Sequence, residues 1–300
     1  MSTLRYDDKV VVVTGAGNGL GRSHALAFAA RGARVVVNDL GGSATGEGAD
    51  RKAANQVVDE ITAAGGEAVA SHESVTDGDR IIQCALDNFN RVDIVINNAG
   101  ILRDKSFHNM TEEDWDLVYN VHVKGAFKVT HAAWPHLREQ EYGRVIFTAS
   151  AAGIYGNFGQ ANYAMAKLGL HGLAQSLAVE GGKRNIVVNT IAPIAGSRMT
   201  ATIMPPQIVE QLKPEFVTPL VLKLCHDTHR ESGRLYEVGA GWVGALRWER
   251  TKGHGFPVSD TLTPEAITEQ WDHINDFARA DHPGNGQEAI MAIIGNLQNR

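Results

Sequence analysis

Three side chains in the middle of the chain have the types and spacing of an acid–base site. Ser150 stands thirteen residues before Tyr163, and Lys167 follows the tyrosine by four residues. A spacing of four places Tyr163 and Lys167 on one face of a helix. A nearby ammonium group favours a phenolate, so we expect Lys167 to lower the pKa of Tyr163 and make it a base. The same spacing also occurs on exposed helix faces without a chemical role. Whether these residues are catalytic therefore depends on the motifs around them.

A glycine-rich turn follows the first apolar run of the chain. Gly15, Gly19 and Gly21 lie between the run at residues 10–13 and a helical pattern. Glycines at such a turn let the main chain approach a pyrophosphate, and the N-terminus of the helix attracts its charge. Ordinary turns also use glycine, but a place between a strand and a helix favours nucleotide binding.

Two more polar positions follow predicted strands. Asp39 comes after the run at 35–37, where a carboxylate can accept hydrogen bonds from ribose hydroxyls and repel the 2′-phosphate of NADP. A loop or helix cap is the alternative role of this aspartate. Asn98 follows the run at 92–96 and can line a dinucleotide crevice or simply stabilise a turn. The pattern predicts NAD as the cofactor.

Short apolar runs alternate with helical patterns along most of the chain. The predicted strands are at 10–13, 35–37, 92–96, 144–147 and 186–191, and the predicted helices at 19–31, 50–64, 77–89, 111–138 and 160–181. Continuous apolar runs indicate strands buried on both faces. We therefore predict an α/β protein with a Rossmann-like, doubly wound parallel sheet and helices on both faces.

The remaining segments are predicted from their prolines and apolar spacing. Residues 196–230 contain four prolines and would form either a mobile lid or a packed connector. We expect residues 1–245 to be one domain and residues 246–300 to be a C-terminal helical extension. Apolar residues recur at helical spacing in the extension and must pack against the same chain or another subunit.

Composition excludes several classes of partner. The net charge is -6 and the pI is about 6.1, so no broad basic surface is available for nucleic acid or an anionic membrane. Neither a secretory signal nor an apolar stretch of about 18 residues is present. Cys84 and Cys225 stand far apart, so we expect neither a metal site nor a disulfide. The last residues, 298–300, do not form a peroxisomal address of the Ser-Lys-Leu type.

With these motifs in view, residues 7–245 resemble the short-chain dehydrogenase/reductase family. The glycine turn, the motif at 97–100 and the set Ser150, Tyr163 and Lys167 occur in the order and spacing of that family. The resemblance implies that these three residues are catalytic and that NAD is the cofactor. It implies the following cofactor-binding residues: Gly15, Asn18, Gly19, Leu20, Gly21, Asp39, Ser74, Val75, Asn98, Ala99, Gly100, Tyr163, Lys167, Ala195, Gly196, Ser197 and Arg198.

Phrases at 38–42, 98–104, 154–163, 196–200 and 238–242 look like those of one group within the family. This group is the (3R)-hydroxyacyl-CoA dehydrogenase units of the type 2 peroxisomal multifunctional enzymes. The likeness implies oxidation of (3R)-3-hydroxyacyl-CoA to 3-oxoacyl-CoA in fatty-acid β-oxidation, by a homodimer. It also implies a peroxisomal location in a eukaryote or a cytoplasmic one in a bacterium. Alternatives are a 3-oxoacyl-carrier-protein reductase, a steroid or alcohol dehydrogenase, or an NAD-sensing protein without turnover.

Three positions depart from the usual family pattern. His122 stands where most members have an asparagine that helps to hold a proton-relay water, and Asn120 lies two residues earlier. The type 2 enzymes share this histidine, so the role of either residue in a relay stays open. Ile194 replaces a usual glycine after Pro193, and Ser74 stands where an acid is often found near the adenine.

Overall fold

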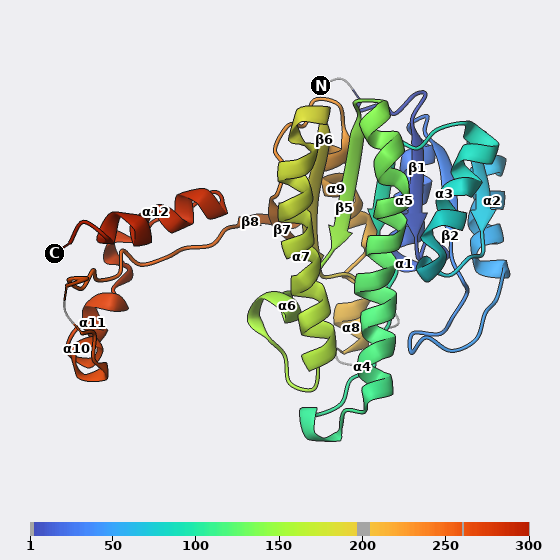
Figure 1. Cartoon of the computed structure of the whole chain (residues 1–300). Coiled ribbons are helices and arrows are strands. Elements are labelled where there is room, and N and C mark those ends of the chain that lie inside the picture. Colours follow the sequence, from blue (N-terminus) through green and yellow to red (C-terminus); the bar gives the residue numbers. More distant parts are fainter. Residues whose placement is uncertain (1–2, 197–204, 260, 300) are drawn as a thin grey trace. The chain divides into compact units, whose positions relative to one another are not determined.

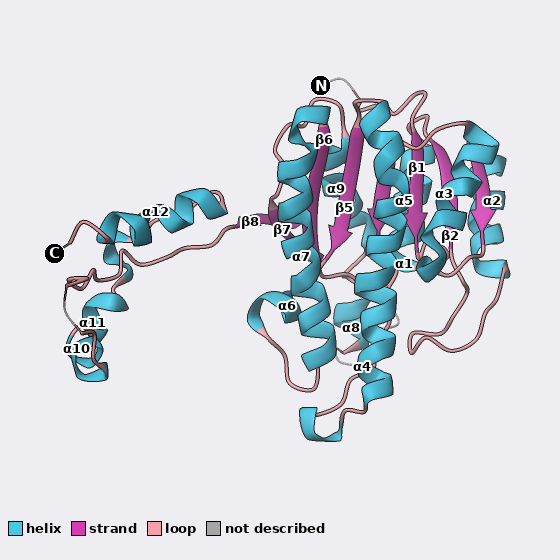
Figure 2. Cartoon of the chain, viewed as in Figure 1, coloured by secondary structure: helices cyan, strands magenta, loops and turns pink. Residues whose placement is uncertain are grey.

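The chain folds into two compact units, Met1–Ala245 and Leu246–Arg300. The computed structural model describes residues 3–196, 205–259 and 261–299. The first unit is a sheet with helices on both faces (Figure 1, Figure 2). Its strands lie in the order β3-β2-β1-β4-β5-β6-β7-β8. The strands are β1 (Val10–Thr14), β2 (Arg34–Asn38), β3 (Glu67–Ser71), β4 (Ile94–Asn97), β5 (Gly143–Thr148), β6 (Ile186–Pro193), β7 (Leu235–Gly239) and β8 (Trp242–Leu246).

All pairings from β3 across to β7 are parallel, and the strand order reverses between β1 and β4. In such a sheet the loops at the reversal diverge and leave a crevice at the carboxyl ends of the strands. The predicted doubly wound α/β fold is therefore confirmed.

Helices cover both faces of this sheet. In the first unit they are α1 (Gly19–Ala29), α2 (Lys52–Ala63), α3 (Gly78–Phe89), α4 (Glu112–Tyr119), α5 (Gly125–Glu139), α6 (Ala151–Tyr155), α7 (Ala161–Gly181), α8 (Pro206–Val209) and α9 (Thr218–Cys225). A π-helical turn, Asn120–Lys124, joins α4 to α5, so the single helix predicted at 111–138 is interrupted. Short 3₁₀ turns span Val75–Asp77, Phe107–Asn109, Gly182–Arg184 and Pro214–Phe216.

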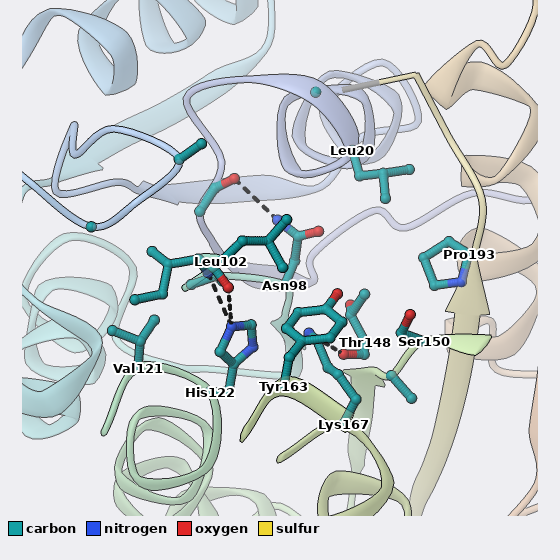
Figure 3. Close-up of a pocket in the computed structure, with 18 of the residues that line it drawn as sticks. Leu20, Asn98, Leu102, Val121, His122, Thr148, Ser150, Tyr163, Lys167 and Pro193 are labelled. Atoms are coloured by element: carbon teal, nitrogen blue, oxygen red, sulfur yellow. Dashed lines mark hydrogen bonds between the residues drawn. The ribbon is translucent and has the colours of Figure 1, made fainter. Parts of the chain in front are cut away.

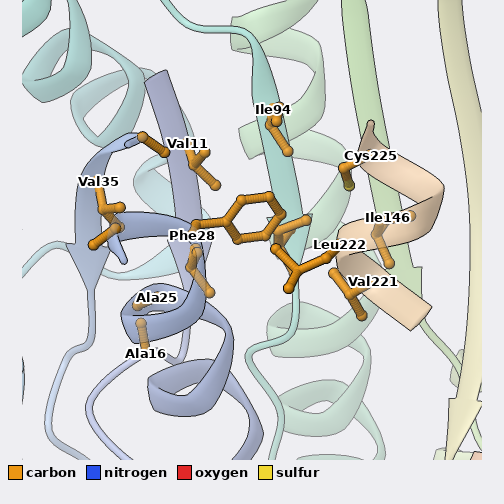
Figure 4. Packing of buried hydrophobic residues seen from close by; sticks show 14 of the residues in the cluster. Val11, Ala16, Ala25, Phe28, Val35, Ile94, Ile146, Val221, Leu222 and Cys225 are labelled. Carbon is orange, nitrogen blue, oxygen red and sulfur yellow. The ribbon is translucent and has the colours of Figure 1, made fainter. Parts of the chain in front are cut away.

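The strands alternate their side chains between two hydrophobic cores. Val11 and Val13 face a core shared with α1, α2 and α9, whereas Val10 and Val12 face a core shared with α3, α5 and α7. This period of two follows from the pleat of a strand. Figure 4 shows Phe28 of α1 in the first core, among side chains from the strands and from α9. The two cores fix the strand ends and hence the loops that form the site.

One strand was missed by the sequence-based expectations, and one of two open alternatives is decided by the structure. Strand β3 was not among the predicted runs, because its residues Glu67–Ser71 are short or polar and only partly buried. The proline-containing region includes α9, whose residues Val221, Leu222 and Cys225 are buried in the first core. Of the two alternatives, a mobile lid or a packed connector, this part of the region is a packed connector.

The second unit contains α10 (Pro264–Glu269), α11 (Trp271–Ile274), the 3₁₀ turn Phe277–Arg279 and α12 (Gly286–Asn296). None of its described residues is buried. Polar contacts connect its segments: Arg250 forms two hydrogen bonds to the carboxylate of Asp281 and a third to the carbonyl of Ala289. Among the helices that the structure describes, none has the length and apolar character needed to cross a membrane.

Candidate active site

A cavity of about 750 Å³ lies at the carboxyl ends of the strands. It is lined by the turn after β1, the loops after β2 and β4, the π-helical turn, and the segments after β5 and β6. Figure 3 shows the part where Ser150, Tyr163 and Lys167 come together beside His122. The topology therefore gathers residues from distant parts of the sequence into one crevice.

Most of the predicted cofactor residues line this cavity. They are Gly15, Asn18, Gly19, Leu20, Asp39, Ser74, Val75, Asn98, Ala99, Gly100, Tyr163, Lys167, Ala195 and Gly196. Gly21 does not, because it packs behind the turn, where a Cβ would clash with the carbonyl oxygen of Gly15. Ser197 and Arg198 lie outside the described residues.

The glycine turn is held tightly against the loop after β4. Gly15 has a φ of 63°, and a Cβ there would lie 2.8 Å from the Cα of Ala99. The side-chain Nδ2 atom of Asn98 donates to the carbonyls of Thr14 and Gly15, at 3.0 and 3.1 Å. Asn98 thus lines the cavity and also stabilises the turn. The sequence left these two roles open as alternatives, and the structure shows both.

Asp39 is held by main-chain donors at the end of β2. Its Oδ2 accepts from the Gly17 amide and its Oδ1 from the Gly41 amide, each at 2.7 Å. Each carboxylate oxygen keeps a further lone pair, and the residue lines the cavity. Arg22 forms an ion pair with Glu60 on α2 and is not a partner of Asp39. The site therefore offers a carboxylate, rather than a guanidinium, at this point.

At the other end of the cavity, α6 and α7 supply the acid–base groups. Ser150 caps α6 through a hydrogen bond from the Ala152 amide at 3.2 Å. The Nζ atom of Lys167 donates to the carbonyl of Thr148 at 2.7 Å and lies 5.4 Å from the centre of the Tyr163 ring. The three side chains form one cluster, as the spacing predicted (Figure 3).

The charge states of this cluster differ from the expectation. Burial raises the pKa of Tyr163 to about 12, and although a hydrogen bond with Ser150 lowers it in part, the charge of Asp104 raises it further. Burial also lowers the pKa of Lys167 to about 7. The predicted lowering of the Tyr163 pKa by Lys167 is wrong for this structure, because loss of water around both groups disfavours their charged forms.

His122 connects the tyrosine to the loop after β4. Its ring meets the Tyr163 ring edge to face, with the centres 5.3 Å apart. Its Nε2 lies 3.0 Å from the amide nitrogen and 2.9 Å from the carbonyl oxygen of Ile101. Burial, and next the charge of Lys167, hold the pKa of His122 well below its usual value, so the imidazole is neutral. Of the two residues considered for a relay, His122 lines the cavity and Asn120 does not.

One wall of the cavity was not predicted. The loop after β2 lines it through Gly42, Ser43, Ala44 and Gly46. Arg103 fastens this loop, because its Nε donates to the carbonyl of Thr45 at 2.8 Å and its Nη2 contacts Glu47 at 3.1 Å. In the sequence, only the unusual length and glycine content of residues 41–48 indicated that this loop is special. No sequence feature pointed to Arg103.

This fold and cavity define a dinucleotide-binding oxidoreductase, because main-chain amides stand at the N-terminus of α1 and an acid–base cluster lies at the far end. The family model described as short chain dehydrogenase matches residues 9–208. The chain therefore belongs to the short-chain dehydrogenase family. It is an oxidoreductase that acts on CH–OH groups, and the family typically uses NAD or NADP.

Three known proteins illustrate the relationship. The chain is 56% identical over 294 residues to the peroxisomal multifunctional enzyme type 2 of Mus musculus, covering 98% of this chain and 40% of that protein. The structure of the full-length peroxisomal multifunctional enzyme type 2 from Drosophila melanogaster matches with a TM-score of 0.84 and 44% identity, over 98% of this chain and 50% of that one. A 7α-hydroxysteroid dehydrogenase complexed with NADH and 7-oxo glycochenodeoxycholic acid matches with a TM-score of 0.71 and 30% identity, over 80% of this chain and 98% of that one. The chain thus spans half or less of the two multifunctional enzymes.

Proposed function

We propose that this chain oxidises (3R)-3-hydroxyacyl-CoA to 3-oxoacyl-CoA with NAD, as a step of fatty-acid β-oxidation. The observation that carries the proposal is the cluster of Ser150, Tyr163 and Lys167 at one end of a dinucleotide-sized cavity. The likeness to peroxisomal multifunctional enzymes along almost the whole chain supports the acyl-CoA substrate.

The proposed chemistry assigns one task to each residue of the cluster. The cofactor accepts the hydride that leaves C3 of the substrate. Ser150 orients the 3-hydroxyl group and stabilises the charge that develops on its oxygen, while Tyr163 as phenolate takes the hydroxyl proton. Lys167 holds the nicotinamide ribose. Because burial raises the pKa of Tyr163 to about 12, the phenolate is scarce at neutral pH and oxidation is favoured at alkaline pH.

Asp39 supports NAD as the proposed cofactor. Its carboxylate would accept hydrogen bonds from the adenosine ribose hydroxyls and repel a 2′-phosphate. Ser74 and Val75 also line the cavity and would contact the adenine. Ala195, Gly196, Ser197 and Arg198 are proposed at the nicotinamide end.

We also propose a homodimer and a compartment. Phe127 on α5 and Val179 on α7 are exposed hydrophobic side chains, which supports pairing of these helices with their counterparts in a second copy. In a eukaryote the enzyme would be peroxisomal, as the names of its relatives suggest, and in a bacterium cytoplasmic. Light scattering should give a mass twice the 32.3 kDa of one chain.

Steady-state turnover of the two 3-hydroxyacyl-CoA enantiomers with NAD and with NADP tests the proposed activity. We expect the (3R) enantiomer with NAD to give the highest kcat/KM of the four combinations. Equal rates for both enantiomers would refute the stereochemical assignment. A preference for 3-oxoacyl-carrier protein with NADPH would favour the reductase instead.

A further inference from the structure

Hydrogen bonds link three polar side chains, Asp104, Gln160 and Asn157, near the acid–base cluster. The amide nitrogen of Gln160 donates to Oδ2 of Asp104 at 2.7 Å, and the amide nitrogen of Asn157 donates to Oε1 of Gln160 at 2.9 Å. The Lys105 amide adds a main-chain hydrogen bond to the carbonyl of Gly159 at 2.9 Å. These contacts join the loop after β4 to the segment that precedes α7. None of these residues has a role in the proposed chemistry so far.

The two partners fix which way the Gln160 amide points. An ionised carboxylate only accepts hydrogen bonds, so the NH₂ group of Gln160 must face Asp104 and its oxygen must face Asn157. One amide hydrogen is thereby used, and the second has no partner among the residues that the structure describes. The orientation of this second hydrogen is therefore set before any substrate arrives.

The position of Gln160 relates it to the acid–base cluster. Gln160 is the residue immediately before α7, and Tyr163 lies in the first turn of that helix, so the two residues are three positions apart at the same helix end. Both line the cavity, and Asp104 is near enough for its charge to act on the Tyr163 phenol. Asn157 also lines the cavity. A ligand whose hydroxyl group reaches Tyr163 therefore lies in the same cavity as Gln160.

Asn162 shows what a purely structural amide looks like at this place. Its side chain is buried, its nitrogen donates to the carbonyls of Arg103 and Asp114, and its oxygen accepts from the Tyr163 amide. All of its strong hydrogen-bonding groups are used within the protein. Gln160 differs because one of its amide hydrogens has no partner among the described residues and because the residue lines the cavity.

We propose that Gln160 donates its second amide hydrogen to the thioester carbonyl oxygen of the substrate, with Asp104 and Asn157 as positioning residues. This inference rests on the proposed function, since it requires a carbonyl group two carbons from the carbinol that is oxidised. The hydroxyl group would be fixed by Ser150 and Tyr163 and the carbonyl group by Gln160. Fixing both groups turns one face of C3 toward the cofactor, so Gln160 contributes to the choice between the enantiomers.

The test compares Gln160→Met with Gln175→Met, an exposed glutamine on the same helix. We expect Gln160→Met to lower kcat/KM for (3R)-3-hydroxybutyryl-CoA by about 10- to 100-fold and to reduce the preference over the (3S) enantiomer. The Kd for NADH, measured by fluorescence, should stay that of the parent enzyme, whereas loss of the hydrogen bonds to Asp104 and Asn157 should lower the thermal midpoint by a few degrees. Gln175→Met should match the parent in every measurement.

A second variant protects the test against a folding defect. Gln160→Leu removes the amide donor with a differently shaped apolar side chain and adds no charge beside Asp104, so it should show the same loss and the same weakened enantiomer preference. Wild-type kcat/KM and enantiomer preference in a folded Gln160→Met or Gln160→Leu protein would overturn the role of Gln160 while leaving the proposed function intact. A parent enzyme that oxidises neither thioester enantiomer would instead overturn the proposed function, and this inference with it.

Discussion

The two ends of the cavity are lined by different kinds of chemical group. At the end that we propose binds adenosine (the adenosine end), main-chain groups and one carboxylate dominate, with Asp39 held by the amides of Gly17 and Gly41. At the reaction end, the walls are side chains that can gain or lose a proton, and two of them, His122 and Lys167, are 2% and 3% exposed. The comparison separates two properties. One end offers fixed hydrogen-bonding groups to a cofactor, and at the other end burial shifts the pKa values of the side chains.

The difference appears in how each charge is compensated. Two amide donors accompany the carboxylate of Asp39, and charge-assisted hydrogen bonds of this kind stabilise an ionised group. Lys167 has a single carbonyl partner, and burial lowers its pKa to about 7. Substitutions at the adenosine end should therefore change cofactor affinity, whereas substitutions at the reaction end should change rate or pH dependence.

Replacement of Tyr163 by phenylalanine should have the largest effect. Tyr163→Phe removes the hydroxyl group that takes the proton, so we expect kcat to fall by about 1000-fold or more. The Kd for NADH should change by less than about twofold, because the adenosine end supplies most of the proposed cofactor contacts. Stopped-flow turnover and fluorescence titration measure the two quantities. Tyr119→Phe, at a half-exposed tyrosine on α4, is the matched control and should leave both unchanged.

Lys167 allows the reaction end to be tested through stability. Its folded pKa of about 7 lies below the ordinary value of 10.5, so between these pH values the unfolded chain binds a proton that the folded chain has released. The stability of the parent enzyme should therefore rise with pH across this window. Lys167→Met removes the buried ammonium, and we expect it to raise the free energy of unfolding at pH 7 by about 2 kcal/mol and to flatten the pH dependence.

Urea unfolding at pH 7 and pH 9.5 measures this effect, with the exposed Lys183→Met as control. A Lys167→Met protein less stable than the parent at pH 7 would show that the hydrogen bond to Thr148 outweighs the cost of burial. The reaction end would then resemble the adenosine end, and the contrast between them would fail.

The same contrast explains what could be predicted from the sequence. The glycine turn, Asp39 and Asn98 are local patterns at strand ends, and the cavity gathers them as expected. The set Ser150, Tyr163 and Lys167 is likewise local, because Ser150 caps α6, the short helix after β5, and α7, the next helix, carries the other two. Such motifs can be recognised from the sequence because their residues lie close together along the chain.

Contacts between distant segments could not be predicted in this way. Gln160 pairs with Asp104 across 56 positions, and Arg103 pairs with Thr45 across 58. Only the packing of the loops brings these groups together, and no spacing rule applies to them. The pKa of Tyr163 was missed for a related reason: its direction depends on burial, which the fold decides.

The smallest of the expected effects belongs to Asp39 at the adenosine end. Asp39→Ala removes the carboxylate and its two main-chain hydrogen bonds, so the Kd for NADH should rise by about 10-fold. The Kd for NADPH should rise less or fall, because the repulsion of the 2′-phosphate is gone. At saturating NAD, kcat should stay within about twofold of the parent value, since the reaction end is untouched. Fluorescence titration with both cofactors, beside Asp50→Ala in the same loop, measures the change in preference. A lower kcat at saturating NAD with an unchanged Kd would mean that Asp39 acts on the chemistry, and the two ends could no longer be treated as separate.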